Sequence, residues 1–286
     1  MPTNAQRFDS RQSMKNKRFE VFHYRDKKLE NISVHHHDFY EIYFFLSGNV
    51  SFKVEGRSYH LEPGDLLLIN PQELHQPEIG QDNLYERIVL WIDRGYLVAM
   101  CGNGVNLAAC FDREAPNHTN LLRLSKVRRA FISQLLEQMN REYYSSEMGS
   151  EAYAQGLLLQ FMVEINRLAR QNATPVQKRE EPDLVSQVLG YIGNHYQENI
   201  TLESLAAEFY VSKYHLSHEF SHRVGTSVYR YVIFRRLMQA RELMAAGQAP
   251  GEVYQSCGFG DYANFYRAFK GEYGISPREF AADVTA

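Results

Sequence analysis

The sequence predicts a multidomain α+β protein, in which a small β-barrel with a helix pair precedes an all-α domain built from two helix-turn-helix units. Residues 19–92 consist of short apolar and aromatic runs separated by glycine and proline turns, which is typical of a small antiparallel barrel. Residues 121–171 change to the period of amphipathic helices. After a proline-containing stretch at 172–182, a short helix, a turn and a second helix are indicated twice, at about 201–225 and about 250–274.

Length and composition favour a cytoplasmic protein. At 286 residues and 33.2 kDa, the chain is long enough for two domains that each bury a core. It has no apolar run long enough to span a membrane, and its polar N-terminus lacks the apolar core of a signal peptide, so we expect no membrane contact and no export. Cys101, Cys110 and Cys257 have neither metal-type nor redox spacing, which fits a reducing compartment. No cofactor is expected.

The first domain is expected to cover residues 19–171, behind a polar, mostly basic N-terminal arm at 1–18. Such an arm is typically a solvated, mobile tail, and a regulatory arm that folds onto another domain is the alternative. Strands are expected at about 19–92, a loop with a short helix at 93–120, and helices at about 121–171 that are interrupted near Met148 and Gly149. Pro175 and Pro182 mark the linker at 172–182, and the second domain occupies 183–286.

The first helix-turn-helix unit is indicated by an apolar stripe and by residues suited to helix ends. Leu205 and Phe209 share one face of a short helix that Thr201 can cap. Ser212 can cap the second helix, and Gly225 can end it, since glycine tolerates the left-handed conformation. The side chains left on the outer face of this second helix are Tyr214, Ser217, His218, Ser221 and His222.

The second unit repeats the pattern about fifty residues later. Gly258 and Gly260 indicate the turn, and Asp261 can cap a helix whose outer face holds Tyr262, Ala263, Asn264, Tyr266, Arg267 and Lys270. An amphipathic helix from about Ser227 to Ala246 joins the two units. Its length of about 30 Å is close to the roughly 34 Å repeat of the major groove, so one chain could read two adjacent groove segments.

Several blocks of the second domain carry a family resemblance. They are Val211-Ser212-Lys213-Tyr214-His215-Leu216, Gly258-Phe259, and Phe265 to Lys270 followed by Gly274 to Phe280. In these blocks the last hundred residues or so resemble the AraC/XylS family of bacterial transcription regulators. The resemblance implies a non-enzymatic, sequence-specific regulator, usually an activator, which binds double-stranded DNA and contacts RNA polymerase.

The resemblance also implies which side chains meet DNA. Base-facing positions would be Lys213, Tyr214, Ser217 and His218 on the first reading helix, and Tyr262, Ala263, Tyr266 and Arg267 on the second. Ser221, His222 and Lys270 would bind phosphates, and Asn264 lies on the same outer face. Arg267 is expected to make a direct base contact, because a guanidinium can bond guanine through two hydrogen bonds.

The first domain resembles a cupin, the small barrel often found in front of this DNA-binding unit. His35-x-His37, Glu41 and Gly48 fit the first cupin motif, and Pro63-Gly64-Asp65, Pro71 and His75 fit the second. In metal-bearing cupins, residues at the positions of His35, His37, Glu41 and His75 hold one ion. Regulatory cupins mostly bind a small molecule without metal, so we expect no metal, although these side chains could also contact an organic effector or have no ligand role.

Strand alternation adds further candidates for an effector site. If Glu41 faces inward, Tyr43 does too, and Arg87 and Trp91 share a face of a later strand. An indole that stacks on a sugar face and an arginine would suit a saccharide, a sugar derivative or a carboxylate effector.

The charge of the second domain argues against tight DNA binding by one chain. Residues 183–286 carry nine basic and eleven acidic residues, a net charge of −2 within a total of −3. Few phosphate contacts per chain would make dimerisation necessary, and the helix pair is where subunits of this family commonly meet. The alternative function is a metal-dependent cupin enzyme, or a metal sensor, fused to a DNA-binding domain.

Overall fold

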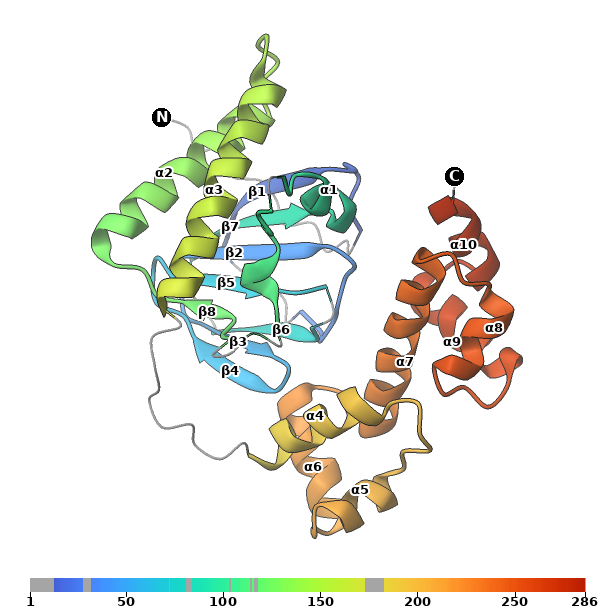
Figure 1. Ribbon diagram of the computed structural model, residues 1–286. Helices are drawn as coiled ribbons and strands as arrows, with labels where there is room; N and C mark the ends of the chain where they lie inside the picture. The colour runs from blue at the N-terminus through green and yellow to red at the C-terminus, as the bar shows by residue number, and fades with distance from the viewer. Residues whose placement is uncertain are drawn as a thin grey trace. The chain divides into compact units, whose positions relative to one another are not determined.

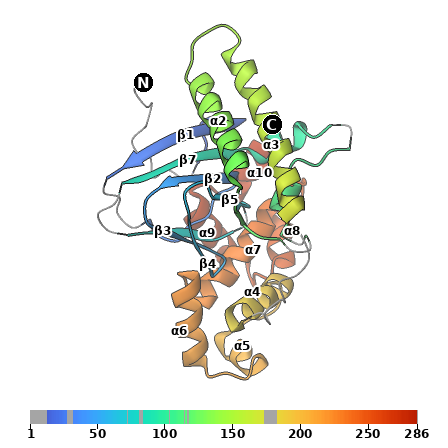
Figure 2. The ribbon, with the colours of Figure 1, turned by 90° about the vertical axis from the view of Figure 1, so that its left-hand side faces the viewer.

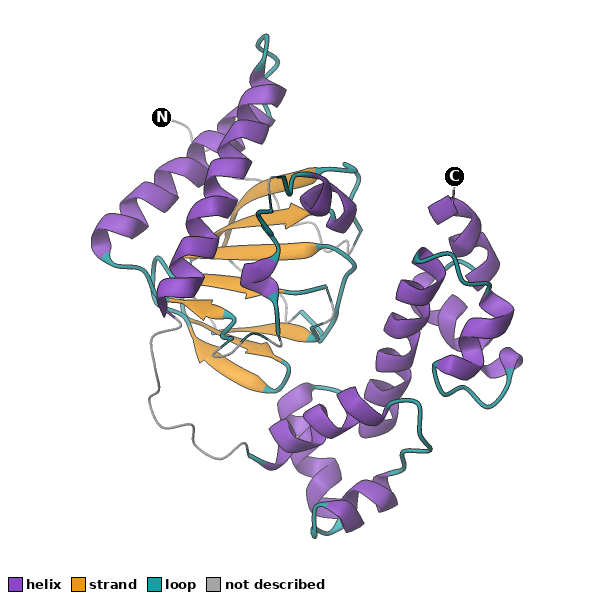
Figure 3. Cartoon of the chain, viewed as in Figure 1, coloured by secondary structure: helices purple, strands orange, loops and turns teal. Residues whose placement is uncertain are grey.

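The computed structural model describes residues 13–27, 32–71, 73–80, 84–102, 104–113, 115, 118–172 and 183–285. The chain divides into two compact units, Met1–Lys178 and Arg179–Ala286. Every described strand belongs to the first unit, whereas the second unit is helical (Figure 3). The predicted fold class is therefore confirmed. The first twelve residues of the expected arm, and the expected linker from residue 173 onward, lie outside the described residues.

The first unit contains two antiparallel sheets (Figure 1). The five-stranded sheet has the order β1 (Phe19–Asp26), β7 (Tyr85–Ile92), β2 (Tyr40–Ser47), β5 (Leu66–Ile69) and β8 (Leu121–Leu122). The three-stranded sheet has the order β4 (Arg57–His60), β3 (Val50–Val54) and β6 (His75–Ile79). Strand β8 occupies the point where the sequence indicated the start of a helix. It forms because Leu121 and Leu122 pair with Leu67 and Leu66 of β5.

Both faces of the five-stranded sheet are buried. Since side chains alternate along a strand, Ile42 and Phe44 of β2 point to one face, and Tyr43 and Phe45 point to the other. The first face packs on helices, and the second faces β3, whose Val50, Phe52 and Val54 complete the barrel interior. This two-sided burial explains the nearly continuous apolar runs of β2, β5 and β7.

Helices α2 (Lys126–Tyr143) and α3 (Ser150–Asn172) form the expected pair and lie side by side (Figure 2). Ser125 caps α2, and Gly149 lies at φ +83° directly before α3. Their apolar stripes cover the outer face of the five-stranded sheet, together with α1 (Arg94–Ala99) and the 3-10 turn Ala109–Phe111. Among the helices that the structure describes, none is both long enough and apolar enough to cross a membrane.

The compact unit Arg179–Ala286 consists of consecutive helices with short connections. They are α4 (Leu184–His195), α5 (Leu202–Glu208), α6 (Lys213–Val224), α7 (Val228–Ala245), α8 (Pro250–Ser256), α9 (Tyr262–Tyr273) and α10 (Pro277–Thr285). Helices α5 and α6 form the first helix-turn-helix unit, and α8 and α9 form the second. Ser212 and Asp261 cap α6 and α9, whereas Gly225 and Gly274 end them in the left-handed conformation. These are the positions that the residue types indicated.

Helix α7 packs into both helix-turn-helix units. Near its start, Tyr231 packs edge-on against Phe220 of α6. Near its end, Leu237, Ala240 and Met244 pack in the core of the second helix-turn-helix unit with Phe265 of α9. With 18 residues, α7 is about 27 Å long.

A close backbone contact also holds the turn of the second helix-turn-helix unit, between α8 and α9, against the loop after α4. Gly258 lies at φ +83°, and a Cβ atom there would be 2.7 Å from the carbonyl oxygen of Gln197. Arg236 of α7 donates to the carbonyl oxygens of Tyr196 and Glu198, both at 2.7 Å. The loop after α4 is therefore held by groups from the second half of the domain.

Candidate functional site

Helix α6 presents one row of polar side chains to solvent. Leu216, Phe220 and Val224 are buried against the neighbouring helices, so the opposite side of α6 is free of core contacts. The sequence-predicted residues Lys213, Tyr214, His218, Ser221 and His222 are exposed, and Ser217 is half-buried. The structure thus brings all six predicted residues of this helix to its accessible side.

The basic residues of α6 have acidic partners. Lys213 Nζ lies 3.6 Å from Glu203 Oε1 of α5. Arg223 donates two hydrogen bonds to the carboxylate of Asp183, the residue that caps α4. His218 lies 3.4 Å from Glu219 Oε1, and its ring is parallel to that of His222 at a centroid distance of 6.3 Å.

Helix α9 presents the corresponding row in the second unit. Phe265 and Phe269 are buried, whereas Tyr262, Ala263, Asn264, Arg267 and Lys270 are exposed and Tyr266 is half-buried. Arg267 donates to Asn264 Oδ1 at 2.5 Å, and Asn264 in turn is bonded to Asp261. The guanidinium that we expected to extend toward a base is therefore held along its own helix in this structure.

Tyr210 is a surface residue of this site that the sequence reasoning did not single out. It lies between α5 and α6 with φ 54° and is 96% exposed. The left-handed conformation is uncommon for a residue other than glycine, and here a hydrogen bond from Val211 N–H to the Ala206 carbonyl fixes it. A large aromatic residue at a turn position that favours glycine or asparagine was the available signal.

A second cluster lies in the barrel interior, where His37, Glu41 and His75 offer ligand atoms within 4.8 Å of one another. All three side chains are buried. The fold joins these distant residues because His35 and His75 exchange two backbone hydrogen bonds, of 3.1 Å and 2.9 Å, beside the start of β6. His37 precedes β2, and Glu41 is the second residue of that strand.

The hydrogen bonds of the two buried histidines determine which ring nitrogen faces Glu41. His37 Nδ1 lies 2.9 Å from the Phe39 carbonyl, and His75 Nδ1 lies 3.0 Å from the Glu73 carbonyl. Because a carbonyl oxygen only accepts, each Nδ1 carries a proton. The two Nε2 atoms both lie 3.3 Å from Glu41 Oε2, so a neutral ring directs a lone pair at a carboxylate oxygen. This arrangement needs a proton or another cation among the three groups.

The pKa directions reflect the same crowding. Burial alone would raise the pKa of the Glu41 carboxyl, but its contacts with His37 and His75 hold that pKa well below its ordinary value. Burial lowers the pKa of His75. Burial, followed by the charge of His75, lowers the pKa of His35 to about 4.

Of the other predicted effector residues, His35 and Trp91 contact this cluster, and Arg87 lies farther along the sheet. The His35 ring is 4.3 Å from that of His75, and Trp91 Nε1 donates to Glu41 Oε1 at 2.9 Å. Tyr43 is buried with its hydroxyl in the interior, and no hydrogen-bond partner for it is found among the described residues. Arg87 lies four residues before Trp91 on β7, about 13 Å away along the strand, where it is paired with Asp26.

The donor set of the cluster fits a divalent transition metal. Two imidazole nitrogens and a carboxylate are suitable ligands, and an Nδ1–H bond to a backbone carbonyl is the usual second contact of a metal-binding histidine. His75 Nε2 is buried, and Glu41 Oε2 at 3.3 Å is the polar atom described beside it. A metal would be held by His37, Glu41 and His75, with His35 adjacent.

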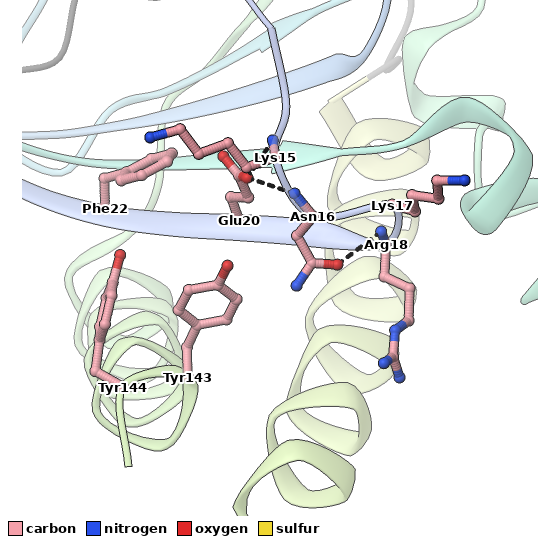
Figure 4. Close-up of a pocket in the computed structure, with 8 residues that line it drawn as sticks. All are labelled: Lys15, Asn16, Lys17, Arg18, Glu20, Phe22, Tyr143 and Tyr144. Carbon is pink, nitrogen blue, oxygen red and sulfur yellow. Dashed lines mark hydrogen bonds between the residues drawn. The ribbon is translucent and has the colours of Figure 1, made fainter. Parts of the chain in front are cut away.

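An open depression of about 600 Å³ lies outside the barrel interior, beside the start of β1 (Figure 4). Its lining residues are Lys15, Asn16, Lys17, Arg18, Glu20, Phe22, Tyr143 and Tyr144. Glu20 is buried, and its Oε1 accepts hydrogen bonds from the N–H groups of Lys15 and Asn16 at 2.6 Å and 2.7 Å. These bonds attach the end of the expected N-terminal arm to β1. None of the predicted effector residues lines the depression.

Comparisons with known proteins agree with this division of the molecule. Residues 20–162, half of the chain, match the family model of the AraC-like ligand binding domain, and residues 205–283 match that of a helix-turn-helix domain. Together with the barrel and the paired reading helices, these matches define a transcription regulator with one ligand-binding and one DNA-binding domain. The chain belongs to the AraC/XylS family.

The individual proteins to which the chain is similar have low sequence identity to it. The HTH-type transcriptional activator RhaS of Escherichia coli O139:H28 is 25% identical over 248 residues, which are 86% of each chain. Among solved structures, wild-type ToxT of Vibrio cholerae with a bound unsaturated fatty acid is 14% identical, covers 94% of this chain and 96% of its own, and has a TM-score of 0.41. The C-terminal domain of AraT, a response regulator of Geobacillus stearothermophilus, is 26% identical over 36% of this chain and 88% of its own, with a TM-score of 0.35.

Proposed function

We propose that this regulator activates transcription by placing α6 and α9 in two adjacent segments of the major groove, under the control of an effector bound in the barrel. The proposal depends mainly on one observation: two helix-turn-helix units, α5–α6 and α8–α9, both pack against the helix α7. Both reading helices have an exposed polar row, and α7 enters the cores of both units. The name of RhaS, a transcriptional activator, supports activation.

The proposed contacts follow the accessible side of each reading helix. We assign base contacts to Lys213, Tyr214, Ser217 and His218 on α6 and to Tyr262, Ala263, Asn264, Tyr266 and Arg267 on α9. Ser221, His222 and Lys270 are assigned to phosphates. For Arg267, the bond to Asn264 would have to exchange for a base, which is feasible because both side chains are exposed.

Selection of binding sites from a random DNA library tests the assignment of Arg267. Arg267→Ala should lose discrimination at one base pair, at a cost of about 1–3 kcal/mol, whereas the rest of the consensus is retained. Arg278→Ala is the matched control, since Arg278 is exposed on α10 outside the reading row. An identical consensus for the wild type and Arg267→Ala would refute the assignment.

We place the effector site at the polar cluster of the barrel interior. His35, His37, Glu41, Tyr43, His75 and Trp91 are its proposed contacts, with Arg87 at the far end of the same face. The buried Tyr43 hydroxyl, which has no hydrogen-bond partner in the described part of the chain, supports an organic ligand with polar groups, such as a sugar, a sugar derivative or a carboxylate. Thermal unfolding across a panel of such compounds should reveal a ligand that raises Tm, and His75→Ala should abolish that rise.

A metal ion is the second candidate for the ligand, because the two Nε2 atoms and Glu41 need a positive group between them. Metal analysis after purification without chelators distinguishes the candidates. One ion per chain, lost in His37→Ala and His75→Ala but retained in His60→Ala on the exposed strand β4, would favour metal sensing. The family relatives are transcription regulators, so we propose that a bound ion serves sensing and that the protein is not an enzyme.

Dimerisation through α2 and α3 completes the proposal. Val127 of α2 and Leu159 of α3 are 80% and 44% exposed, which leaves apolar groups for a second copy of the helix pair. Sedimentation of Leu159→Glu should show a shift from dimer to monomer, whereas Val98→Glu on α1 should leave the dimer intact. RNA polymerase would be a further partner of the DNA-bound dimer.

A further inference from the structure

The two halves of the DNA-binding unit differ in charge. Residues 183–227, which contain the first reading unit, carry two basic residues, Lys213 and Arg223, and five acidic ones, a net charge of −3. Residues 228–286 carry seven basic and six acidic residues, a net charge of +1. The net charge of −2 of the whole domain thus arises from the first half. Since attraction to phosphates supplies most non-specific DNA affinity, this half repels DNA when its histidines are neutral.

The permanent cations of α6 are already neutralised by neighbouring helices. Glu203 of α5 faces Lys213 at 3.6 Å, and Asp183 at the start of α4 accepts two hydrogen bonds from Arg223. Burial alone would raise the pKa of Asp183, but bonds from the Ser186 N–H and from Arg223 lower it, so this carboxylate stays charged near neutral pH. Neither cation adds net positive charge to the reading row.

Three imidazoles remain on the accessible part of α6. His215, His218 and His222 are all exposed and lie within two turns of the helix. Histidine is the side chain whose charge ordinarily changes between about pH 5 and pH 8. The charged groups described near them are Glu219, Lys213 and Arg223 on α6 itself, Glu203 from α5, and Asp183 at the start of α4. From α7, Tyr231 packs on the buried side of α6.

We infer that the imidazolium ions of His215, His218 and His222 supply the positive charge that attracts the first reading unit to the phosphate backbone, whichever group of the DNA each ring touches, so that this unit engages DNA more tightly as the pH falls. Full protonation of the three rings changes the net charge of residues 183–227 from −3 to 0, or to +1 if His195 is also charged. The second unit, with its permanent charge of +1, holds DNA at higher pH. This inference rests on the proposed docking of α6 and goes beyond it in assigning the charge state that makes docking favourable.

Fluorescence anisotropy of the full chain on a random-sequence DNA duplex tests the inference, because non-specific binding isolates the phosphate term. Between about pH 8.5 and about pH 6, wild-type affinity should rise about tenfold, and the slope of log K against log salt should steepen by about 2. His218→Gln/His222→Gln should lose most of this response. His218→Lys/His222→Lys should bind at about pH 8.5 at least as tightly as the wild type does at about pH 6. His60→Gln, an exposed histidine of the barrel, is the matched control and should respond as the wild type does.

The outcomes separate this inference from the proposed function. An equal pH response of the wild type and the double Gln variant would overturn the inference while leaving DNA binding intact. The absence of DNA binding at every pH would overturn both. Thermal unfolding of each variant at both pH values identifies loss of folding. The Lys pair provides the independent check, because its exposed side chains are good helix formers and should restore binding.

Discussion

Arg223 Nη1 lies 2.6 Å from Asp183 Oδ1, and its Nη2 lies 3.2 Å from Oδ2, across 40 positions of the chain. Asp183 also accepts a hydrogen bond from the Ser186 N–H, which caps α4. One carboxylate therefore joins the first residue described after the linker region to the last turn of the first reading helix. Both the start of α4 and the end of α6 therefore depend on the Asp183 carboxylate.

Asp183→Ala should lower the free energy of unfolding of the DNA-binding unit by about 1 kcal/mol, chiefly through the lost cap. Asp183→Asn keeps a capping oxygen and should lose only about 0.5 kcal/mol, because the ion pair is half exposed and screened by solvent. Urea unfolding of the two variants measures the difference. Equal losses for Ala and Asn would assign the effect to the ion pair instead of the cap.

The stabilisation by Asp183 should depend on pH in a defined direction. Since its pKa is lower in the folded protein than in the unfolded chain, the contribution is fully present above the unfolded value of about 4 and is lost as the pH falls through the folded value. The stability difference between the wild type and Asp183→Asn should therefore shrink below about pH 4. A difference that grows on acidification would contradict this sign.

Gly64→Ala should loosen the helix pair from the barrel. Gly64 lies at φ +95°, and an added Cβ would overlap the side chain of Arg129 on α2. We expect a loss of about 1–3 kcal/mol in unfolding free energy, from backbone strain and from displacement of Arg129. Gly102→Ala, where a Cβ meets no atom within 4 Å, should be nearly neutral. The double variant Gly64→Ala/Arg129→Ala should regain the unfolding free energy lost through the overlap with Arg129, but not the part lost through backbone strain at residue 64.

Gly258→Ala should impair DNA binding by separating the second turn from α4. Its Cβ would lie 2.7 Å from the Gln197 carbonyl oxygen, and a backbone atom cannot move aside as a flexible side chain can. Gly260→Ala, two residues away, meets no atom within 4 Å and serves as the control. The Gly258 variant should bind random-sequence DNA more weakly than the Gly260 variant, while ligand-induced stabilisation of the barrel is unchanged. Equal binding by both would show that this contact is dispensable.

The effect of Glu41→Gln on stability should show whether the barrel holds a metal ion. In chelator-treated protein, the amide can donate to an Nε2 lone pair of His37 or His75 and still accept from Trp91, so stability should equal or exceed that of the wild type. If an ion occupies the cluster, the same substitution should destabilise the untreated protein. Glu86→Gln, which alters a carboxylate paired with His23, should show no dependence on chelator. Emission of Trp91, the only tryptophan of the chain, reports on the cluster directly.

Local signals in the sequence were sufficient for the architecture. Caps such as Ser212 and Asp261, and glycines such as Gly225, act within one helical turn, so their residue types predict where helices begin and end. Alternation on β2 likewise predicted that Tyr43 shares a face with Glu41, and the structure turns this face to the interior. The two residues of β8 could not be found in this way. Their strand pairing depends on β5, more than fifty positions earlier.

Side-chain partners were the part that the sequence could not supply. Arg267 was expected to reach outward, but its bond to Asn264 depends on rotamers that no pattern encodes. The pairing of Arg223 with Asp183 depends on how α4 packs against α6. The cupin resemblance placed His37, Glu41 and His75 together, and the structure added the carbonyl partners that orient their rings.

The length of α7 fixes the rotational phase between the two reading helices. Each added residue would turn α9 by about 100° relative to α6 and advance it by about 1.5 Å. In the proposed docking, a single insertion would turn the second helix away from its own groove segment, and a two-turn insertion would restore the angle between the helices while lengthening the span by about three base pairs. In the proposed docking of α6 and α9, the number of residues in α7 therefore sets the spacing of the target sequence.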